Sequence, residues 1–287
     1  MPGLGSILTA MVTPFDADGR VDEEAAVMLM HHLLAHGSDG LVICGTTGEA
    51  STLTDEEHLG MIELAVGEMQ GRGTIVAGVG SNDTRHAVHL TKRATELGAD
   101  ALLSVNPYYN RPNRRGIVRH YEEVARATDK PILLYNIPQR TASDMPNDLL
   151  AELAQIEGIV GVKQANHANL AKIDGLMIYA GNDDMLAEVL DLGEPGGILV
   201  ASHLFGPEMR RMVDEPERRR EIDASLKDVY RDMSIAPAAV LIKAALGLLD
   251  LSVGEPRLPY VPVDEDELAV MRSMLERHGL RQASVQA

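Results

Sequence analysis

The sequence predicts an α/β protein, a (β/α)8 TIM barrel with a small C-terminal helical appendage. Eight short, apolar, β-like runs recur along the chain, and each is followed by a turn and a longer segment with helical periodicity. Continuously apolar strands that alternate with helices indicate parallel strands buried on both faces, and eight such units can close into a barrel. An open doubly wound sheet is the alternative. We expect the barrel over residues 1–220 and the helical region over residues 221–287.

The expected elements follow in order along the barrel region. The strands are Ser6–Val12, Gly40–Cys44, Thr74–Val79, Ala101–Val105, Pro131–Asn136, Ile159–Lys163, Leu176–Ala180 and Gly197–Ala201. The helices between them are Asp22–His36, Asp55–Met69, Thr84–Leu97, Gly116–Ala127, Asn147–Leu153, Asn169–Gly175 and Asp184–Leu192. Thr54 and Glu57 have capping-box spacing and mark the start of the second helix. Beyond about Arg220 the pattern is helical, over Glu221–Met233, Pro237–Leu249 and Glu265–His278.

Composition narrows the classes of partner. A formal net charge of -17 and a pI near 4.9 oppose attraction to nucleic acid or to anionic membranes. The only cysteine, Cys44, lies in an apolar run and is expected to be a buried structural thiol. The N-terminus lacks a basic region followed by a long apolar stretch, and no long uncharged apolar window occurs, so we expect a soluble, cytoplasmic protein.

Lys163 is the residue that most strongly suggests chemistry. It ends the apolar run that begins at Ile159, so its amine is expected to be partly desolvated at the carboxyl end of a barrel strand, where active sites form. Desolvation lowers the pKa of a lysine and frees the lone pair that attacks ketones to form a Schiff base. The alternative is an ordinary strand-end lysine that reaches out to solvent.

Residues at three other strand ends fit a small carboxylic acid. The loop Gly45–Glu49 offers the hydroxyls and amides of Thr46 and Thr47, although alone it could be a plain turn. Tyr109 follows the fourth strand, and Tyr135 lies near the end of the fifth. A phenol at such a position can relay protons, or it can simply lie at the edge of the domain with its hydroxyl in water. Arg140 could hold a carboxylate in bidentate fashion, or pair with surface acids.

Other candidates for chemistry are weaker. Lys243 is expected to be partly buried, but it lies on a helix outside the barrel and has no strand-end context. The remaining lysines have charged neighbours and are expected to be solvated. His31 and His32 point to different sides of a helix, while His86 and His89 indicate a surface pair, so we expect no metal site.

The ordered motifs resemble the dihydrodipicolinate synthase family, within the N-acetylneuraminate lyase superfamily of pyruvate aldolases. The resemblance covers nearly the whole chain. It is carried by Thr13-Pro14-Phe15, Gly45-Thr46-Thr47-Gly48-Glu49, Asn106-Pro107-Tyr108-Tyr109-Asn110-Arg111-Pro112, Tyr135-Asn136-Ile137-Pro138-Gln139-Arg140-Thr141 and Gly161-Val162-Lys163.

The resemblance implies a Schiff-base condensation of pyruvate with aspartate 4-semialdehyde, which belongs to lysine and diaminopimelate biosynthesis, with no cofactor and no metal. It implies that Lys163 forms the Schiff base, that Tyr135, Thr46 and Tyr109 relay protons, and that Thr47, Arg140, Gly181 and Ile198 bind substrate. It also implies a homo-oligomer, a dimer or tetramer, in which the residue at position 109 reaches into a neighbouring subunit's site.

Three departures from the family pattern bear on the second substrate. Gln164 stands where many members have an acidic residue, Ala142 replaces a frequent glycine, and Asn182 replaces the first aspartate of Gly-Asp-Asp. A pyruvate-dependent aldolase that acts on a sugar acid, such as N-acetylneuraminate or 2-keto-3-deoxygluconate, is the alternative, and a non-catalytic binding protein is a third. His86 and Asp55 differ from lysine-sensitive members, so we expect weak or absent inhibition by lysine.

Overall fold

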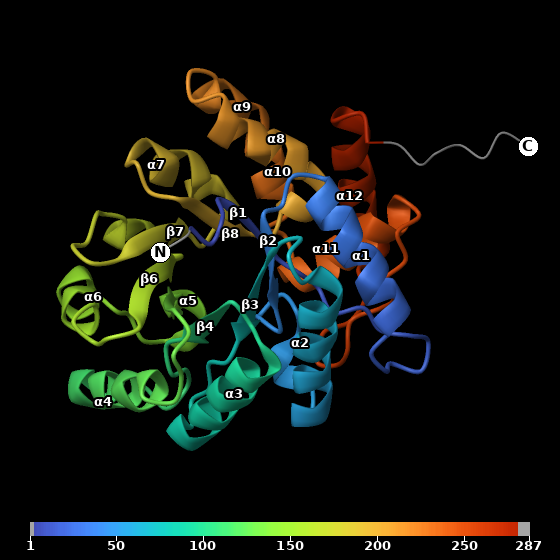
Figure 1. The fold of residues 1–287 in the computed structure, drawn as a ribbon. Helices are drawn as coiled ribbons and strands as arrows, with labels where there is room; N and C mark the ends of the chain where they lie inside the picture. Colours follow the sequence, from blue (N-terminus) through green and yellow to red (C-terminus); the bar gives the residue numbers. More distant parts are fainter. Residues whose placement is uncertain (1–2, 281–287) are drawn as a thin grey trace, which may run out of the picture.

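Eight parallel strands close into a barrel in the order of the sequence (Figure 1). This computed structural model describes residues 3–280. The strands are β1 (Ile7–Ala10), β2 (Gly40–Ile43), β3 (Thr74–Gly78), β4 (Ala101–Val105), β5 (Ile132–Asn136), β6 (Ile159–Gln164), β7 (Met177–Ala180) and β8 (Gly196–Leu199). Pairing of β1 with β8 completes the ring, so the predicted barrel is confirmed and the open sheet is wrong.

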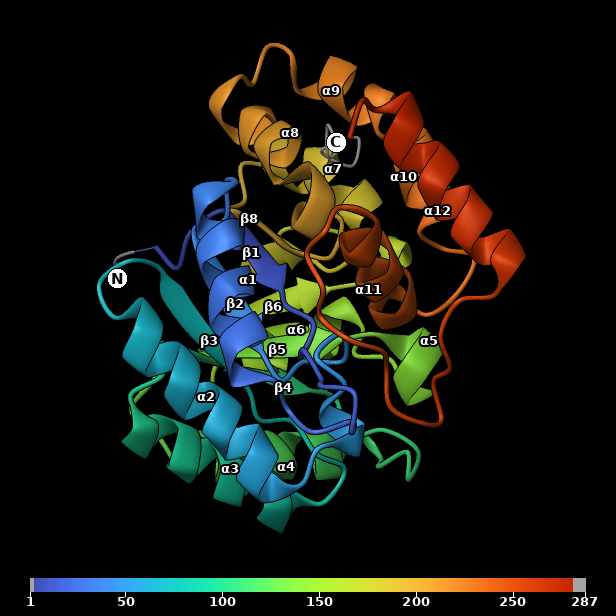
Figure 2. The same ribbon diagram turned by 90° about the vertical axis from the view of Figure 1, so that its right-hand side faces the viewer.

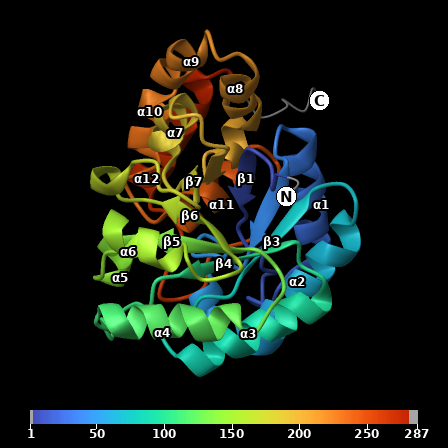
Figure 3. The same ribbon diagram turned by 60° about the vertical axis from the view of Figure 1, so that its left-hand side comes forward.

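The helices of the barrel region surround the strands, and α2, α3 and α4 lie next to one another along one side (Figure 3). They are α1 (Glu23–Ala35), α2 (Asp55–Met69), α3 (Thr84–Leu97), α4 (Arg114–Ala125), α5 (Pro138–Thr141), α6 (Asn147–Leu153), α7 (Leu186–Asp191) and α8 (Ser202–Asp214). The predicted capping box at the start of α2 is confirmed. The N–H of Glu57 donates to the Thr54 hydroxyl at 3.2 Å, and the Glu57 carboxylate accepts from the N–H of Thr54 at 2.9 Å.

The helix predicted over Asn169–Gly175 is wrong. The connection from β6 to β7 holds the short 3-10 helix η2 (His167–Asn169), followed by a bend and a turn in which Ile173 and Leu176 form an isolated bridge. The Asn169 side chain instead donates to Asp144 at 3.0 and 2.9 Å, and Asn166 caps η2, so local side-chain bonds replace the helical ones.

The C-terminal helices continue from the barrel and cover one side of it. They are α9 (Arg219–Ser225), α10 (Lys227–Asp232), α11 (Ala238–Leu248) and α12 (Glu265–Arg277). The single helix expected over Glu221–Met233 is divided at Leu226, whose φ of -102° and ψ of 3° are not helical. In Figure 2, α11 and the segment that leads to α12 lie on the same side of the strands as α5. No helix within residues 3–280 has the length and apolarity that crossing a membrane requires.

Two apolar clusters divide the interior. A larger one lies between the strands and the helices and includes Val162 and Leu134, whereas a smaller one fills the barrel and includes Leu133, Tyr135 and Ile198. Side chains alternate between the two faces of a strand. The interior side of β5 therefore ends at Tyr135, and the register places the next strand's Lys163 beside it.

Candidate active site

Lys163 and Tyr135 lie next to each other near the carboxyl ends of β6 and β5. The parallel register pairs these two residues directly. The Lys163 Nζ is 4.4 Å from the centroid of the Tyr135 ring, and the two residues are only 4% and 5% exposed. The structure therefore brings together the amine and the phenol that the sequence singled out.

The Lys163 amine has a perturbed pKa. Burial lowers the pKa of Lys163 to about 8; the negative charge of Asp183 opposes this shift, and the positive charge of Arg140 adds to it. With a pKa of about 8, roughly one amine in ten is neutral at pH 7, against roughly one in a few thousand for an ordinary lysine. A buried lysine with this neutral fraction is suited to nucleophilic attack on a carbonyl.

Asp183 is a neighbour of Lys163 for which the sequence reasoning assigned no role. Its Oδ1 accepts the N–H groups of Val200 at 2.9 Å and Ala201 at 3.0 Å, so it fixes the chain that follows β8. Burial raises the pKa of Asp183, whereas these two bonds and the charge of Lys163 lower it. The sequence shows only that an acidic residue, Asp183, follows the seventh strand. It could not show that Asp183 lies near Lys163, because that proximity depends on closure of the barrel.

Tyr135 carries its proton at neutral pH. Burial raises the pKa of the Tyr135 phenol to about 12, although Arg140 and the Thr46 side chain both lower it. A neutral phenol next to an amine nucleophile can donate a proton to a developing alkoxide and later take one back. The geometry is therefore suited to acid–base work at the carbon that Lys163 attacks.

The loop Gly45–Glu49 presents hydrogen-bond donors beside this pair. Thr46 is exposed and Thr47 is buried, and their backbone N–H groups have no acceptor in the part of the chain that the structure describes. The N–H of Glu49 donates to the Thr46 carbonyl at 3.1 Å, and the Thr13 hydroxyl donates to the Gly48 carbonyl at 2.7 Å. These bonds close the loop into a defined turn whose free donors suit a small carboxylate.

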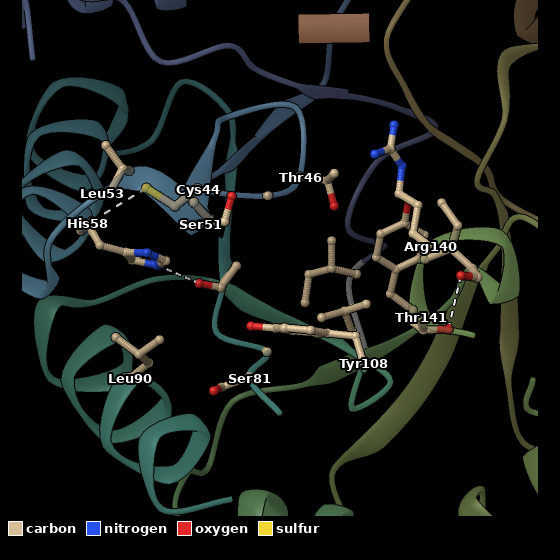
Figure 4. A pocket seen from close by; sticks show the side chains of 18 of the residues that line it. Cys44, Thr46, Ser51, Leu53, His58, Ser81, Leu90, Tyr108, Arg140 and Thr141 are labelled. Atoms are coloured by element: carbon tan, nitrogen blue, oxygen red, sulfur yellow. Dashed lines mark hydrogen bonds between the residues drawn. The ribbon is translucent and has the colours of Figure 1, made fainter. Parts of the chain in front are cut away.

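Arg140 and Thr46 both line a cavity of about 300 Å³ (Figure 4). Both residues and Tyr135 line this cavity, whereas Lys163 lies beside Tyr135 rather than on the cavity wall. Arg140 lies on α5, which begins with a proline, a residue preorganised for that position. The helix ends at Thr141, and the next residue, Ala142, has a φ of 55°, in the left-handed region that favours the glycine expected there.

Gly181 and Ile198 do not line this cavity. The Gly181 N–H donates to the Gln164 carbonyl at 2.8 Å, and a Cβ at this position would lie 2.8 Å from the Ala165 nitrogen. Gly181 therefore allows the ends of β6 and β7 to approach closely. Ile198 is fully buried in the apolar cluster that fills the barrel.

Tyr109 stands apart from the other predicted catalytic residues. It is 87% exposed, its φ is 71°, and it is not among the residues that line the cavity, although Tyr108 is. A large aromatic side chain held outward on a left-handed residue is unusual for a monomer surface. Within one chain, Tyr109 therefore does not join Lys163 and Tyr135.

Asp55 and His86, at which the sequence differs from lysine-sensitive members, share the cavity with Thr46. Ser51, Asp55, His58 and His86 line it, and the Asp55 carboxylate is 2.9 Å from His86 Nε2. Asp55 is therefore already paired within the chain. Weak or absent inhibition by lysine stays a prediction.

Comparison with known proteins identifies the relationship of the whole chain. The model of the dihydrodipicolinate synthetase family matches residues 3–278. The chain belongs to this family. Two relatives with similar sequences are named 4-hydroxy-tetrahydrodipicolinate synthase. The protein of a Synechococcus strain is 39% identical, over 96% of this chain and 94% of the relative. The protein of Bacillus velezensis is 37% identical, over 95% of this chain and 98% of the relative.

Solved family structures have the same fold over nearly their whole length. Dihydrodipicolinate synthase from Bacillus anthracis superimposes with a TM-score of 0.92 at 35% identity, covering 96% of this chain and 99% of that one. The chloride-inhibited dihydrodipicolinate synthase from Acinetobacter baumannii, solved in complex with pyruvate, superimposes with a TM-score of 0.93 at 33% identity. The match covers 97% of this chain and 100% of that one. The family expected from the motifs is thus confirmed.

Proposed function

We propose that this family member condenses pyruvate with L-aspartate 4-semialdehyde to 4-hydroxy-tetrahydrodipicolinate, the reaction for which its relatives are named, and so acts as a lyase of lysine and diaminopimelate biosynthesis. The observation that carries the proposal is the buried Lys163 amine beside Tyr135, with its pKa lowered to about 8. Such an amine fits capture of a 2-keto acid by Schiff-base formation.

The first half of the reaction is capture of pyruvate. The neutral Lys163 amine adds to the pyruvate carbonyl carbon, Tyr135 donates a proton to the oxygen, and water leaves as the imine forms. The free donors of Thr46 and Thr47 hold the pyruvate carboxylate. Loss of a methyl proton then gives an enamine, which is a carbon nucleophile.

The second half joins the two substrates. The enamine carbon attacks the aldehyde of aspartate 4-semialdehyde, while Arg140 binds that substrate's carboxylate in bidentate fashion. The amino group of the semialdehyde then attacks the imine carbon, the ring closes, and Lys163 is released. One water leaves overall, and the lysine itself supplies the electron sink, so we propose that neither a metal nor an organic cofactor takes part.

We also propose a homo-oligomer, a dimer or tetramer, that completes the site. The support is Tyr109, which is 87% exposed on a left-handed residue and away from its own chain's cavity. In a symmetric pair, the Tyr109 hydroxyl of each subunit would reach the Thr46 and Tyr135 hydroxyls of the other and extend their proton relay.

The free cysteine bears on the location of the protein. Cys44 is a buried free thiol, as expected. A free thiol suits a reducing compartment, and we propose the cytoplasm.

A substrate panel tests the choice of second substrate. We expect pyruvate-dependent consumption of L-aspartate 4-semialdehyde, and no release of pyruvate from N-acetylneuraminate or 2-keto-3-deoxygluconate. The departures at Gln164 and Asn182 make this comparison necessary. Cleavage of a sugar acid without condensation would assign the chain to the alternative aldolases, and neither reaction would favour a binding protein.

A further inference from the structure

Glu49, the last residue of the loop that carries Thr46 and Thr47, is a fully buried carboxylate. It is 1% exposed, and its φ of 54° places it in the left-handed region. Its Oε1 is 2.7 Å from the Nζ of Lys243, and its Oε2 accepts the N–H of Arg257 at 2.9 Å. A carboxylate removed from water needs such partners, because an unpaired buried charge is strongly unfavourable.

Lys243 reaches this loop from outside the barrel, on α11. Its side chain is 2% exposed, and its Nζ also donates to the Glu255 carbonyl at 3.2 Å. Burial lowers the pKa of Lys243, and the Glu49 carboxylate raises it. Lys243 does not line the cavity of Thr46 and Arg140, so it is not placed to meet substrate.

Phe15 and Arg257 complete the contact between the C-terminal region and the loop. The Phe15 ring centroid is 4.0 Å from the Lys243 Nζ and 4.3 Å from the Arg257 guanidinium carbon, so two cations contact one ring. Arg257 also donates to the Thr52 carbonyl at 2.9 Å and pairs with Glu57. The last residue of the loop and the chain that follows it are thus tied to residues more than 180 positions away in the sequence.

We propose that the Glu49–Lys243 pair positions the Thr46–Thr47 loop to bind the substrate carboxylate, with Lys243 acting as a positioning residue. The N–H of Glu49 bonds to the Thr46 carbonyl at 3.1 Å, so fixing Glu49 also fixes the turn that presents the free donors. The idea rests on the proposed capture of pyruvate by Lys163. Because the coupling is reciprocal, carboxylate binding also strengthens the attachment of α11.

Borohydride trapping of two carbonyl probes tests this positioning role. Pyruvate carries the carboxylate that the loop would bind, whereas acetone presents a ketone without it. In Lys243→Met we expect the ratio of trapping efficiencies, pyruvate over acetone, to fall roughly tenfold, within the usual range of coupling between sites. The concentration of pyruvate at half-maximal trapping should rise, while the trapping rate at saturation changes little.

Matched variants separate positioning from folding. Lys243→Arg should recover much of the ratio, and Glu49→Gln should lower it. The double variant Glu49→Gln with Lys243→Met removes both charges, so it should fold even where one single variant does not. Its trapping ratio should fall no further than that of the more impaired single variant. Lys92→Met, on the exposed face of α3, should match wild type.

The outcomes distinguish two failures. A folded Lys243→Met or double variant with an unchanged ratio would overturn the positioning role, as would an equal fall for both probes. If wild type traps no pyruvate at all, the proposed function itself fails, and this inference fails with it.

Discussion

At the scale of the residue, the chemistry depends on a lysine whose charge is controlled by its neighbours. The position of Lys163 could be predicted because it follows an apolar strand. The lowering of its pKa by burial could also be predicted, but its size could not, because Asp183 and Arg140 contribute to it and these two residues follow other strands. Glu49 belongs to one of the sequence motifs, but its buried partner Lys243 on α11 is about 190 positions away, so no local pattern could predict the pair.

The pH dependence of pyruvate capture follows from the pKa of Lys163. The amine reacts only when neutral, so kcat/KM for pyruvate should rise about tenfold per pH unit below 8 and level off above it. Asp183 raises this pKa, so Asp183→Asn should move the midpoint of the profile to lower pH. The rate of borohydride trapping at subsaturating pyruvate measures the profile directly.

Asp184→Asn provides the matched control, because it makes the same change of charge on the neighbouring, half-exposed residue. Its midpoint should stay close to that of wild type. A midpoint that moves upward in Asp183→Asn, or one that moves equally in both variants, would contradict the assigned role of Asp183.

At the scale of the element, apolar runs and capping signals predicted most of the strands and helices. The bounds of α2, α3, α6 and β4 agree residue by residue with those expected. One failure lies between β6 and β7, where Asn166 and Asn169 bond to the local backbone and to Asp144. A short polar segment of this kind has no apolar face by which its conformation could be predicted.

The capping box of α2 should contribute to stability. Thr54→Ala removes the acceptor of the Glu57 N–H and should lower the free energy of unfolding by about 1 kcal/mol. Urea unfolding at fixed protein concentration measures the change. Thr54→Ser keeps the oxygen and should remain within a few tenths of wild type; equal losses in the two variants would show that the cap is not responsible.

At the scale of the whole molecule, closure of the barrel gathers residues from several strand ends into one site. The repeated alternation of apolar runs and helices was sufficient to predict the barrel. The family resemblance implied that Tyr109 acts in a neighbouring subunit's site, whereas sequence pattern alone could not show it, because the outward direction of Tyr109 depends on the loop conformation. The exposed phenol supports a site completed by a second subunit.

Mixing two impaired variants tests this shared site. In a hybrid dimer of Tyr109→Phe and Tyr135→Phe, one of the two sites has both tyrosines intact. Random pairing of equal amounts makes half of the dimers hybrid, so about a quarter of the sites should be complete and about a quarter of wild-type activity should return. Activity equal to the mean of the two parent variants after co-refolding would contradict the exchange of Tyr109 between subunits.

The central claim is that Lys163 captures pyruvate, and mass spectrometry after borohydride reduction tests it most directly. We predict a three-carbon adduct on the peptide that contains Lys163, together with loss of activity, and no adduct in Lys163→Met. Lys243 is an internal comparison, because it is equally buried but paired with Glu49. Absence of an adduct, or an adduct on Lys243 instead, would contradict the account.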